Sequence, residues 1–425
     1  MLGFLRLLAL FEALLIVGAA VQVTRVNSNG YTSISLVSQF ALAAGGEVQL
    51  EVEGATSTAI TGSRPRALFI LAGEEASKGW FDQWLSTVQS DLPDYTRAVW
   101  ELVCSSPASA RFEVTGNGSW NYTVGISDLY NAYLFICLPQ DYFVGTVTTT
   151  LINPDPGGEL TEHLSINLAL LPNIYALACA IWAAGSTVWS IEVFRRRALA
   201  NEIHYLLTSV LWFKVAQTAL VAAFYRDYSQ DGSSHGGLRR TAVMLLNAGQ
   251  VLFLFTLTLL GLGWRYLRQT LHAKEWQGLA CVYTLYALLA LIEGFCSSGD
   301  QCYVYVLMGY IVRIMLMLAT IVAINYTVQQ VRVVIQLPWT RTVAADYFQL
   351  HQFKTFRLLF LAYLVFPTAL LVVNIVFLDW EWDWLTYALE EIITIVIYTC
   401  IMVTFIPFDK WFLDRAFDTN APLED

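Results

Sequence analysis

Charged residues are scarce in this chain of 425 residues. They make up 14% of it, whereas 56% of the residues are hydrophobic and the mean hydropathy is +0.52. Soluble proteins carry about 25% charged residues, so the composition indicates a membrane protein. Basic residues are scarcer than acidic ones, and the net charge is −10. Because nucleic-acid binding requires a basic surface, the charge balance argues against nucleic acid as a partner.

Enzyme motifs are also missing from the sequence. No HExxH or GxxxxGK pattern occurs, and no two of the five histidines stand at the spacing of metal ligands. One GxSxG match, at residues 232–236, follows an expected membrane span and not the strand that a nucleophile elbow requires. The seven cysteines match neither a zinc nor a haem pattern. We therefore predict that the protein is not an enzyme and has no catalytic residue, metal site or cofactor.

The N-terminus has the pattern of a secretory signal peptide. Arg6 gives a weakly basic start, residues 7–17 form an apolar core, and residues 18–20 are small, as at a cleavage site. We predict a signal peptide over residues 1–20. Because Glu12 interrupts the apolar core, an uncleaved anchor is the alternative. Either one places the following segment in the lumen or outside the cell.

Residues 21–167 are strongly acidic, with 15 Asp and Glu against 6 Lys and Arg. They contain short runs of alternating apolar and polar residues, separated by Gly, Pro, Asn and Asp, which is typical of antiparallel strands. We predict that this segment is a lumenal or extracellular antiparallel β-sandwich. The expected strands cover 32–41, 47–53, 67–71, 97–103, 111–115, 132–138 and 144–152.

Seven hydrophobic stretches follow, each near the ~20 residues that a helix needs to cross a membrane. We therefore predict a seven-helix transmembrane bundle over residues 168–408 and a cytosolic tail over 409–425. The expected spans are 172–194, 203–225, 241–264, 277–295, 303–326, 356–378 and 385–407.

The basic residues between the spans predict the orientation of the bundle. Twelve lie on the side that holds the C-terminus and three on the opposite side, and cytosolic loops are the basic ones. The N-terminus is then lumenal or extracellular and the C-terminus cytosolic. We expect a multi-pass protein of the secretory pathway (Golgi) or the plasma membrane. Residues 328–355 form the expected long cytosolic connection between spans five and six.

The extracytosolic side also predicts covalent modifications. Thiols in an oxidising compartment tend to form disulfides, so we expect one bridge between Cys104 and Cys137 and a second between Cys296 and Cys302. Other pairings are compatible with the sequence. Two Asn-x-Ser/Thr sequons stand in a Gly-rich segment that we interpret as a turn. They predict glycosylation at Asn117 and Asn121.

Polar side chains within the spans are costly unless they are paired or hydrated, and such residues suggest a functional site. They could line an intramembrane polar cavity, or they could fix helix packing. The residues concerned are Lys214, Asn247, Gln250, Glu293, Arg313, Glu390 and Glu391. From their depths in the spans, we expect Lys214 to pair with Glu391, with Glu390 as the alternative partner. By the same reasoning, Glu293 could pair with Arg313.

Several short motifs occur in an order that resembles the intimal-thickness-related-receptor-like family. That family has a rhodopsin-like receptor transmembrane domain and belongs to the Golgi-dynamics-domain seven-transmembrane superfamily. The likeness covers most of the chain, most strongly from about residue 150. The motifs are Leu151–Gly158 (LINPDPGG), His163, Tyr228–Gly232 (YSQDG), Gly263-Trp264, Arg313 and Phe356–Pro367.

The chain differs from ordinary rhodopsin-class receptors at both helix ends where those receptors carry motifs. Span three ends with Gly263–Tyr266 and has no acidic residue before Arg265. Span seven ends with Phe405–Phe408 and lacks the Asn-Pro-x-x-Tyr pattern. No cysteine stands at the start of span three to bridge the second lumenal loop.

The resemblance implies a seven-transmembrane, receptor-like protein. Such a protein would bind a protein or peptide ligand through its sandwich or the cavity above the helices. It would signal to a cytosolic partner in the manner of a G-protein-coupled receptor. One alternative is a chaperone for cargo or lipid in the secretory pathway, with a trafficking partner. The other is an ion conduit along the buried Lys and Glu residues. In all three cases membrane lipid surrounds the spans.

Overall fold

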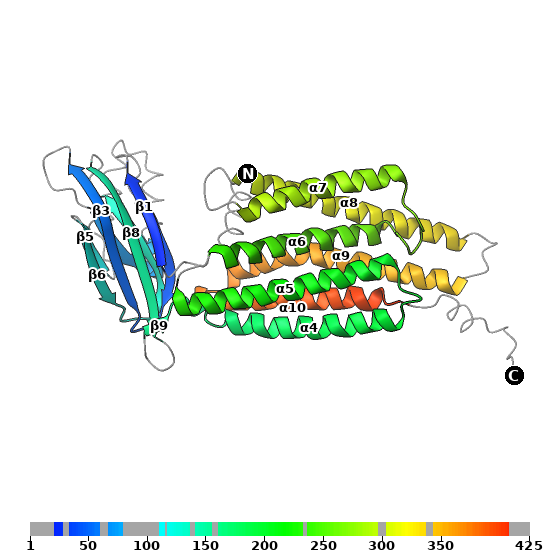
Figure 1. The fold of residues 1–425 in the computed structure, drawn as a ribbon, viewed down its shortest axis with the longest axis horizontal. Helices are drawn as coiled ribbons and strands as arrows, with labels where there is room; N and C mark the ends of the chain where they lie inside the picture. Colours follow the sequence, from blue (N-terminus) through cyan, green and yellow to red (C-terminus); the bar gives the residue numbers. More distant parts are fainter. Residues whose placement is uncertain are drawn as a thin grey trace. The chain divides into compact units, whose positions relative to one another are not determined.

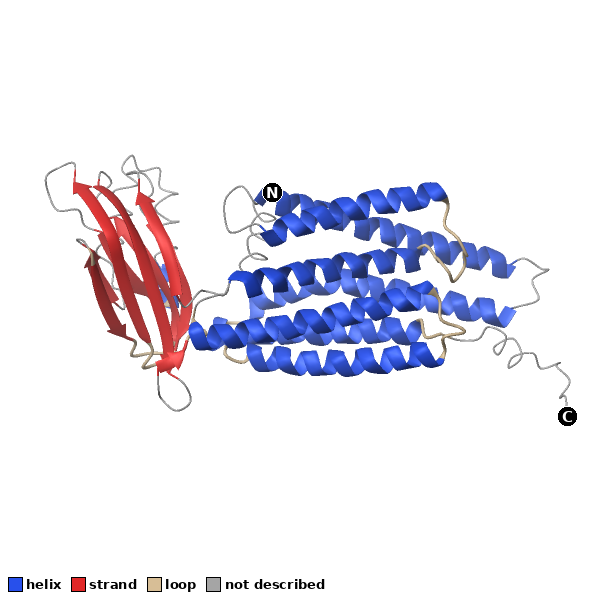
Figure 2. Cartoon of the chain, in the orientation of Figure 1, coloured by secondary structure: helices blue, strands red, loops and turns tan. Residues whose placement is uncertain are grey.

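The computed structural model describes residues 21–28, 34–59, 67–79, 110–114, 117–136, 141–154, 160–232, 236–295, 303–336 and 343–407. The chain divides into two compact units. The first unit consists of Met1–Leu170 together with Tyr225–His235, and the second consists of Leu171–Phe224 and Gly236–Asp425. Figure 2 shows that the first unit is built on strands and the second on helices.

Two antiparallel sheets form the first unit, as the sequence predicted (Figure 1). One sheet has the strand order β1-β8-β3-β6, with β9 paired to the end of β8, and the other has the order β2-β7-β4-β5. The strands are β1 (Val21–Ser28), β2 (Ile34–Leu42), β3 (Glu47–Ala59), β4 (Ala67–Ala72), β5 (Ala110–Val114), β6 (Gly118–Thr123), β7 (Asp128–Ile136), β8 (Asp141–Pro154) and β9 (Leu160–Glu162).

Strand β3 shows why this segment folds as a sandwich. Val48, Leu50 and Val52 are each 1% exposed, whereas the acidic residues Glu51 and Glu53 between and after them are exposed. Successive side chains of a strand point to opposite faces, so the alternation places one face in the core and the acidic face in solvent. Buried aromatic and aliphatic residues of β2 and β4 complete the core, among them Phe40, Leu42, Phe69 and Leu71.

Three strands, β1, β6 and β9, lie outside the runs that we expected to form strands. Strand β1 begins at Val21, directly after the predicted signal peptide. Strand β6 occupies the Gly-rich segment that we interpreted as a turn, so that interpretation was wrong. Pairing to β3 from Glu47↔Thr123 to Val52↔Gly118 holds β6 in the sheet despite its glycine. The strand expected at 97–103 lies outside the described residues.

Within the described residues, the second unit has seven helices that are each long and apolar enough to cross a membrane. The prediction of seven spans is therefore confirmed. The helices are α4 (Leu171–Arg195), α5 (Glu202–Asp231), α6 (Gly236–Gly261), α7 (Ala273–Phe295), α8 (Tyr303–Gln336), α9 (Val343–Phe377) and α10 (Asp383–Thr404). One end of the bundle carries Arg195–Arg197, Arg265 and Arg268, and we call it the basic end.

The long connection expected at residues 328–355 was placed wrongly. Helix α8 continues to Gln336 and α9 begins at Val343. Polar residues in this segment suggested a loop, but its apolar residues recur at helical spacing and pack inward. Val328, Val331 and Phe353 are 2%, 4% and 0% exposed and belong to the bundle core.

Candidate functional site

A buried ion pair joins three helices of the bundle. Lys214 Nζ on α5 lies 2.9 Å from Glu391 Oε1 on α10, and the two side chains are only 13% and 9% exposed. Trp182 on α4 donates its indole N–H to the other carboxylate oxygen, Oε2, at 3.2 Å. Lys214 Nζ also lies 5.9 Å from the centre of the Trp182 ring, within the range of a cation–π contact. The predicted pairing of Lys214 with Glu391 is thus present, whereas its role in ligand binding stays a prediction.

Arg313 on α8 forms the centre of a second polar cluster. Its Nη1 donates to Gln250 Oε1 on α6 at 3.2 Å, and Tyr286 and Tyr363 interact electrostatically with the guanidinium. Glu293 interacts with the same Tyr286, so it lies on the margin of this cluster. The structure gives Arg313 the Gln250 amide as a neutral partner, and a direct Glu293–Arg313 pair stays a prediction.

The other two candidate polar residues of the spans have different surroundings. Asn247 Nδ2 donates to the backbone carbonyl of Ala290 at 3.0 Å, which fastens α6 to α7 and is a packing role. Glu390 interacts electrostatically with Lys214, Glu391 and Arg313. It therefore connects the Lys214–Glu391–Trp182 cluster to the Arg313 cluster, whereas Asn247 forms a separate contact.

Carbonyl groups at the end of α10 and just after it are hydrogen-bonded by side chains from other segments. Gln352 on α9 donates its Nε2 to the carbonyl of Thr404, the last residue of α10, at 2.8 Å. A helix leaves its last four carbonyls without partners of its own, so this donor satisfies a group that would otherwise be unpaired. Arg196, just after α4, donates its Nη1 to the carbonyl of Pro407, which follows the helix, at 2.8 Å.

The Phe405 carbonyl, between those of Thr404 and Pro407, is hydrogen-bonded by His204 and Tyr266. Asn201 donates its backbone N–H to His204 Nδ1 at 2.8 Å, so Nδ1 is an acceptor and the ring proton is on Nε2. Nε2 lies 3.1 Å from the Phe405 carbonyl oxygen, and the Tyr266 hydroxyl donates to the same oxygen at 3.2 Å. We call the four donors and the carbonyls of Thr404, Phe405 and Pro407 the α10-end network.

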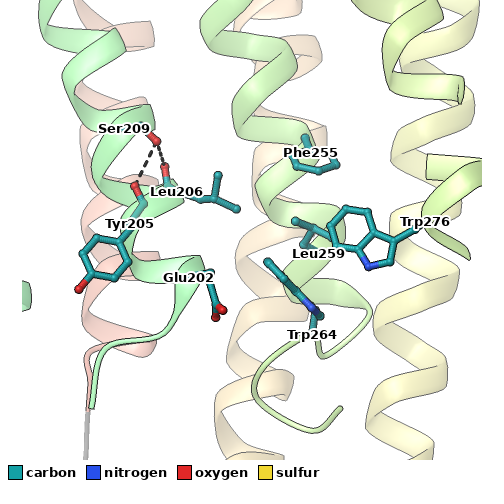
Figure 3. Close-up of a pocket in the computed structure, with 8 residues that line it drawn as sticks. All are labelled: Glu202, Tyr205, Leu206, Ser209, Phe255, Leu259, Trp264 and Trp276. Carbon is teal, nitrogen blue, oxygen red and sulfur yellow. Dashed lines mark hydrogen bonds between the residues drawn. The ribbon is translucent and has the colours of Figure 1, made fainter. Parts of the chain in front are cut away.

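A cavity of about 540 Å³ opens between α5, α6 and α7 at the basic end (Figure 3). In Figure 3, Leu206 points from α5 toward Phe255 and Leu259 on α6, whereas Tyr205 points away from them. The ring of Trp264 meets that of Trp276 edge to face, with centroids 5.5 Å apart. The lining residues are Glu202, Tyr205, Leu206, Ser209, Phe255, Leu259, Trp264 and Trp276. We call this cavity the α5–α6–α7 groove.

In the sandwich, Asn153 of the LINPDPGG motif connects three segments. Its side-chain oxygen accepts from Ala43 N at 2.8 Å, and its Nδ2 donates to the carbonyls of Ala41 and Leu164 at 3.2 and 2.9 Å. Asn153 is 3% exposed. Burial without these bonds would cost about 1–3 kcal/mol for each unpaired group, so the motif residue has a structural role.

His163 and the YSQDG motif contact each other within the first unit. His163 N donates to the Ser229 carbonyl at 3.0 Å. Gly232 ends the helix with a positive φ of 63°, and its N–H bonds the Tyr228 carbonyl at 3.0 Å. A Cβ at Gly232 would lie 2.6 Å from the His163 ring, which explains why glycine stands there. Burial lowers the pKa of His163 below its ordinary 6.5.

The predicted modification sites fall partly within the described residues. Asn121 lies in β6, and Asn117 stands one residue before it; both are exposed. Strand β6 is at the edge of its sheet, so both side chains are open to modifying enzymes. The four cysteines of the predicted disulfides, Cys104, Cys137, Cys296 and Cys302, lie outside the described residues, and their bridges stay predictions.

Comparison with known proteins gives the family of the helical unit. Residues 170–410, more than half of the chain, match the family model described as "GOST, seven transmembrane domain". This chain belongs to the GOST seven-transmembrane family. A protein of Arabidopsis thaliana named candidate G-protein coupled receptor 6 is 22% identical over 296 residues, which is 69% of this chain and 68% of that protein. The predicted superfamily is confirmed, and the protein is a receptor-like, multi-pass membrane protein.

Sequence reasoning missed the α10-end network and the α5–α6–α7 groove of the GOST domain. His204, Tyr266 and Gln352 stand far apart in the chain, and each is an ordinary polar residue in its local sequence. One signal was available. Span seven ends with Phe405–Phe408, which supplies no glycine and no basic residue to satisfy the final carbonyls, so donors from elsewhere were to be expected.

Proposed function

We propose that this GOST protein is a receptor in which α10 transmits a ligand signal along the bundle. The observation that carries the proposal is the position of two polar clusters on one helix. Glu391 takes part in the buried ion pair, and the carbonyls at the end of α10 are bound by side chains of other segments. A change in the ion pair can shift α10 and with it the donors at the basic end.

The proposal takes the N-terminus as lumenal or extracellular and the basic end as cytosolic, since basic loops face the cytosol. A ligand that binds the sandwich or enters from the lumenal side would then act on Lys214 and Glu391. A cytosolic partner would recognise the altered end of α10. The order of the short motifs supports a finer placement in the intimal-thickness-related-receptor-like family. The printed name of the Arabidopsis thaliana relative supports a receptor function.

If α10 couples its two polar clusters, a change at Glu391 must alter the stability of the contacts at the other end of the helix. The test is hydrogen exchange of the full-length protein in nanodiscs, with Glu391→Gln compared to wild type. We expect faster exchange at the amides of α5 and α9 that pack against the α10-end network, whose first carbonyl, that of Thr404, lies thirteen residues after Glu391. Thr394→Val is the matched control, because it lies on the same helix three residues away and its hydroxyl donates to the Glu390 carbonyl within α10.

Two outcomes would overturn the proposal. One is a hydrogen-exchange rate at the basic end that is the same in Glu391→Gln as in wild type. The other is an equal response to Thr394→Val, because a general loss of helix stability would then explain the effect. Protease treatment of sealed microsomes tests the orientation separately: the sandwich should be protected, and a tag after Asp425 should be removed.

A further inference from the structure

The α5–α6–α7 groove is deep enough to hold a lipid headgroup and the first part of an acyl chain. Glu202 is the first residue of α5, and Ser209 lies seven residues further, which is ~10 Å at 1.5 Å per residue. The interfacial layer on each side of the hydrocarbon core is about 5–8 Å thick. The groove thus begins at the helix ends and reaches into hydrocarbon. Its volume of about 540 Å³ is typical of small-molecule sites.

The walls change in chemistry along this depth. The inner part is apolar, formed by Leu206, Phe255 and Leu259, and suits an acyl chain. The outer part holds the two indoles of Trp264 and Trp276. Neither indole N–H donates a hydrogen bond to any residue in the part of the chain that the structure describes. An indole N–H is a donor only, so the outer part suits a ligand with acceptor oxygens.

Charges of both signs stand at the mouth of the groove. The Glu202 carboxylate lines it and forms an ion pair with Arg265. The Arg265 guanidinium lies 5.6 Å from the centre of the Trp264 ring. A carboxylate in the lining disfavours a purely anionic headgroup. A carboxylate beside a guanidinium matches a headgroup with one ammonium and one phosphate.

We propose that the α5–α6–α7 groove binds one zwitterionic, amine-bearing phospholipid. The ammonium lies against Glu202, the phosphate and ester oxygens accept from Arg265 and the two indole N–H groups, and one acyl chain lies along Leu206, Phe255 and Leu259. This site does not depend on signalling by the protein.

Tryptophans at helix ends often form a belt that faces bulk lipid, and the test separates a bound lipid from such a belt. Full-length protein is purified, exchanged into equal amounts of phosphatidylethanolamine and phosphatidylglycerol with identical chains, and analysed by native mass spectrometry. We expect one retained equivalent, with the ethanolamine lipid favoured about fivefold, as one added ion pair at a partly exposed site provides.

Variants assign the recognition to named side chains. Glu202→Gln should abolish the headgroup preference. The double variant Trp264→Phe, Trp276→Phe keeps aromatic rings but removes both N–H donors, and it should weaken retention about tenfold. Matched controls are Glu275→Gln, an exposed acid paired with Arg268 outside the groove lining, and Trp212→Phe, whose indole donates to Ser190.

Three results would overturn the proposal. No retained lipid would mean that the indoles form a simple belt. Equal retention of both lipids by wild type would remove the role of Glu202. Preferential retention of phosphatidylglycerol would indicate an anionic-lipid site. Because Glu202 is about half exposed and the tryptophan changes keep the rings, we expect these variants to fold, which their monodispersity in detergent checks.

Discussion

Replacing Lys214 with methionine removes the cation of the buried ion pair and keeps a side chain of similar length. The change leaves Glu391, a carboxylate that is 9% exposed in its side chain, with the Trp182 indole as its one side-chain donor among the described residues. Removing one partner of a buried pair costs about 3–5 kcal/mol, because the remaining charge stays desolvated. We therefore expect Lys214→Met to lower the free energy of unfolding by about 3–5 kcal/mol.

The companion variants follow from the same contacts. Glu391→Gln keeps an oxygen that can accept from Lys214 or Trp182, so its cost should be smaller than that of Lys214→Met. The double variant has no unpaired charge, and its cost should fall short of the sum of the two by about 1–3 kcal/mol. Trp182→Phe removes one hydrogen bond, which is worth about 0.6 and at most about 1.7 kcal/mol between membrane helices.

Reversible denaturant unfolding of purified protein in mixed micelles measures these differences. Thr394→Val provides the control, since the Thr394 hydroxyl donates to the Glu390 carbonyl within α10 and takes no part in the ion pair; it should change stability by less than about 0.5 kcal/mol. Costs that add without a coupling term would refute the reasoning, because contact at 2.9 Å in a buried site requires coupling. A Thr394 variant that is as unstable as the Lys214 variant would also refute it.

Three further predictions concern the first unit. Gly232→Ala should lower its stability by about 1–3 kcal/mol, because the residue has a left-handed φ and the new Cβ would meet the His163 ring. Gly125→Ala, in the same unit and with open space for the Cβ, should cost nothing in the same thermal-unfolding assay. Since burial lowers the pKa of His163, the unfolded chain takes up the proton first, so stability is full above about pH 6.5 and falls as the pH drops from there toward the lower folded pKa. His163→Gln should flatten that pH profile, and an unchanged profile would assign the effect elsewhere. Protein from a eukaryotic secretory host should lose mass on N-glycosidase treatment, and the double variant Asn117→Gln, Asn121→Gln should not. Peptides that carry no glycan at either site would contradict the lumenal placement of the sandwich.

Features with a local cause in the sequence could be predicted. Each span is a run of apolar side chains long enough to cross hydrocarbon, and the alternation in β3 is set by one strand's two faces. The Lys214–Glu391 pair could be inferred because depth along a helix follows from residue count. The end of α8 could not be predicted. A helix that leaves the hydrocarbon core loses its continuous apolar sequence there but does not have to end. Val328 and Val331 continue to pack against other helices beyond that point.

The α10-end network had no local cause, and this explains why it escaped sequence reasoning. Three carbonyls within four residues are bound by donors from three different parts of the chain, at Arg196 and His204, at Tyr266 and at Gln352. A carbonyl has no sequence signature, because every residue has one. Only the packing of the helices decides which side chain reaches it. The same holds for the α5–α6–α7 groove. In the sequence, Trp264 and Trp276 each resemble an ordinary residue of an aromatic belt. They line one groove because the fold brings the centroids of their rings to 5.5 Å from each other. In this protein the structural elements follow from local sequence, whereas the candidate sites arise where distant elements meet.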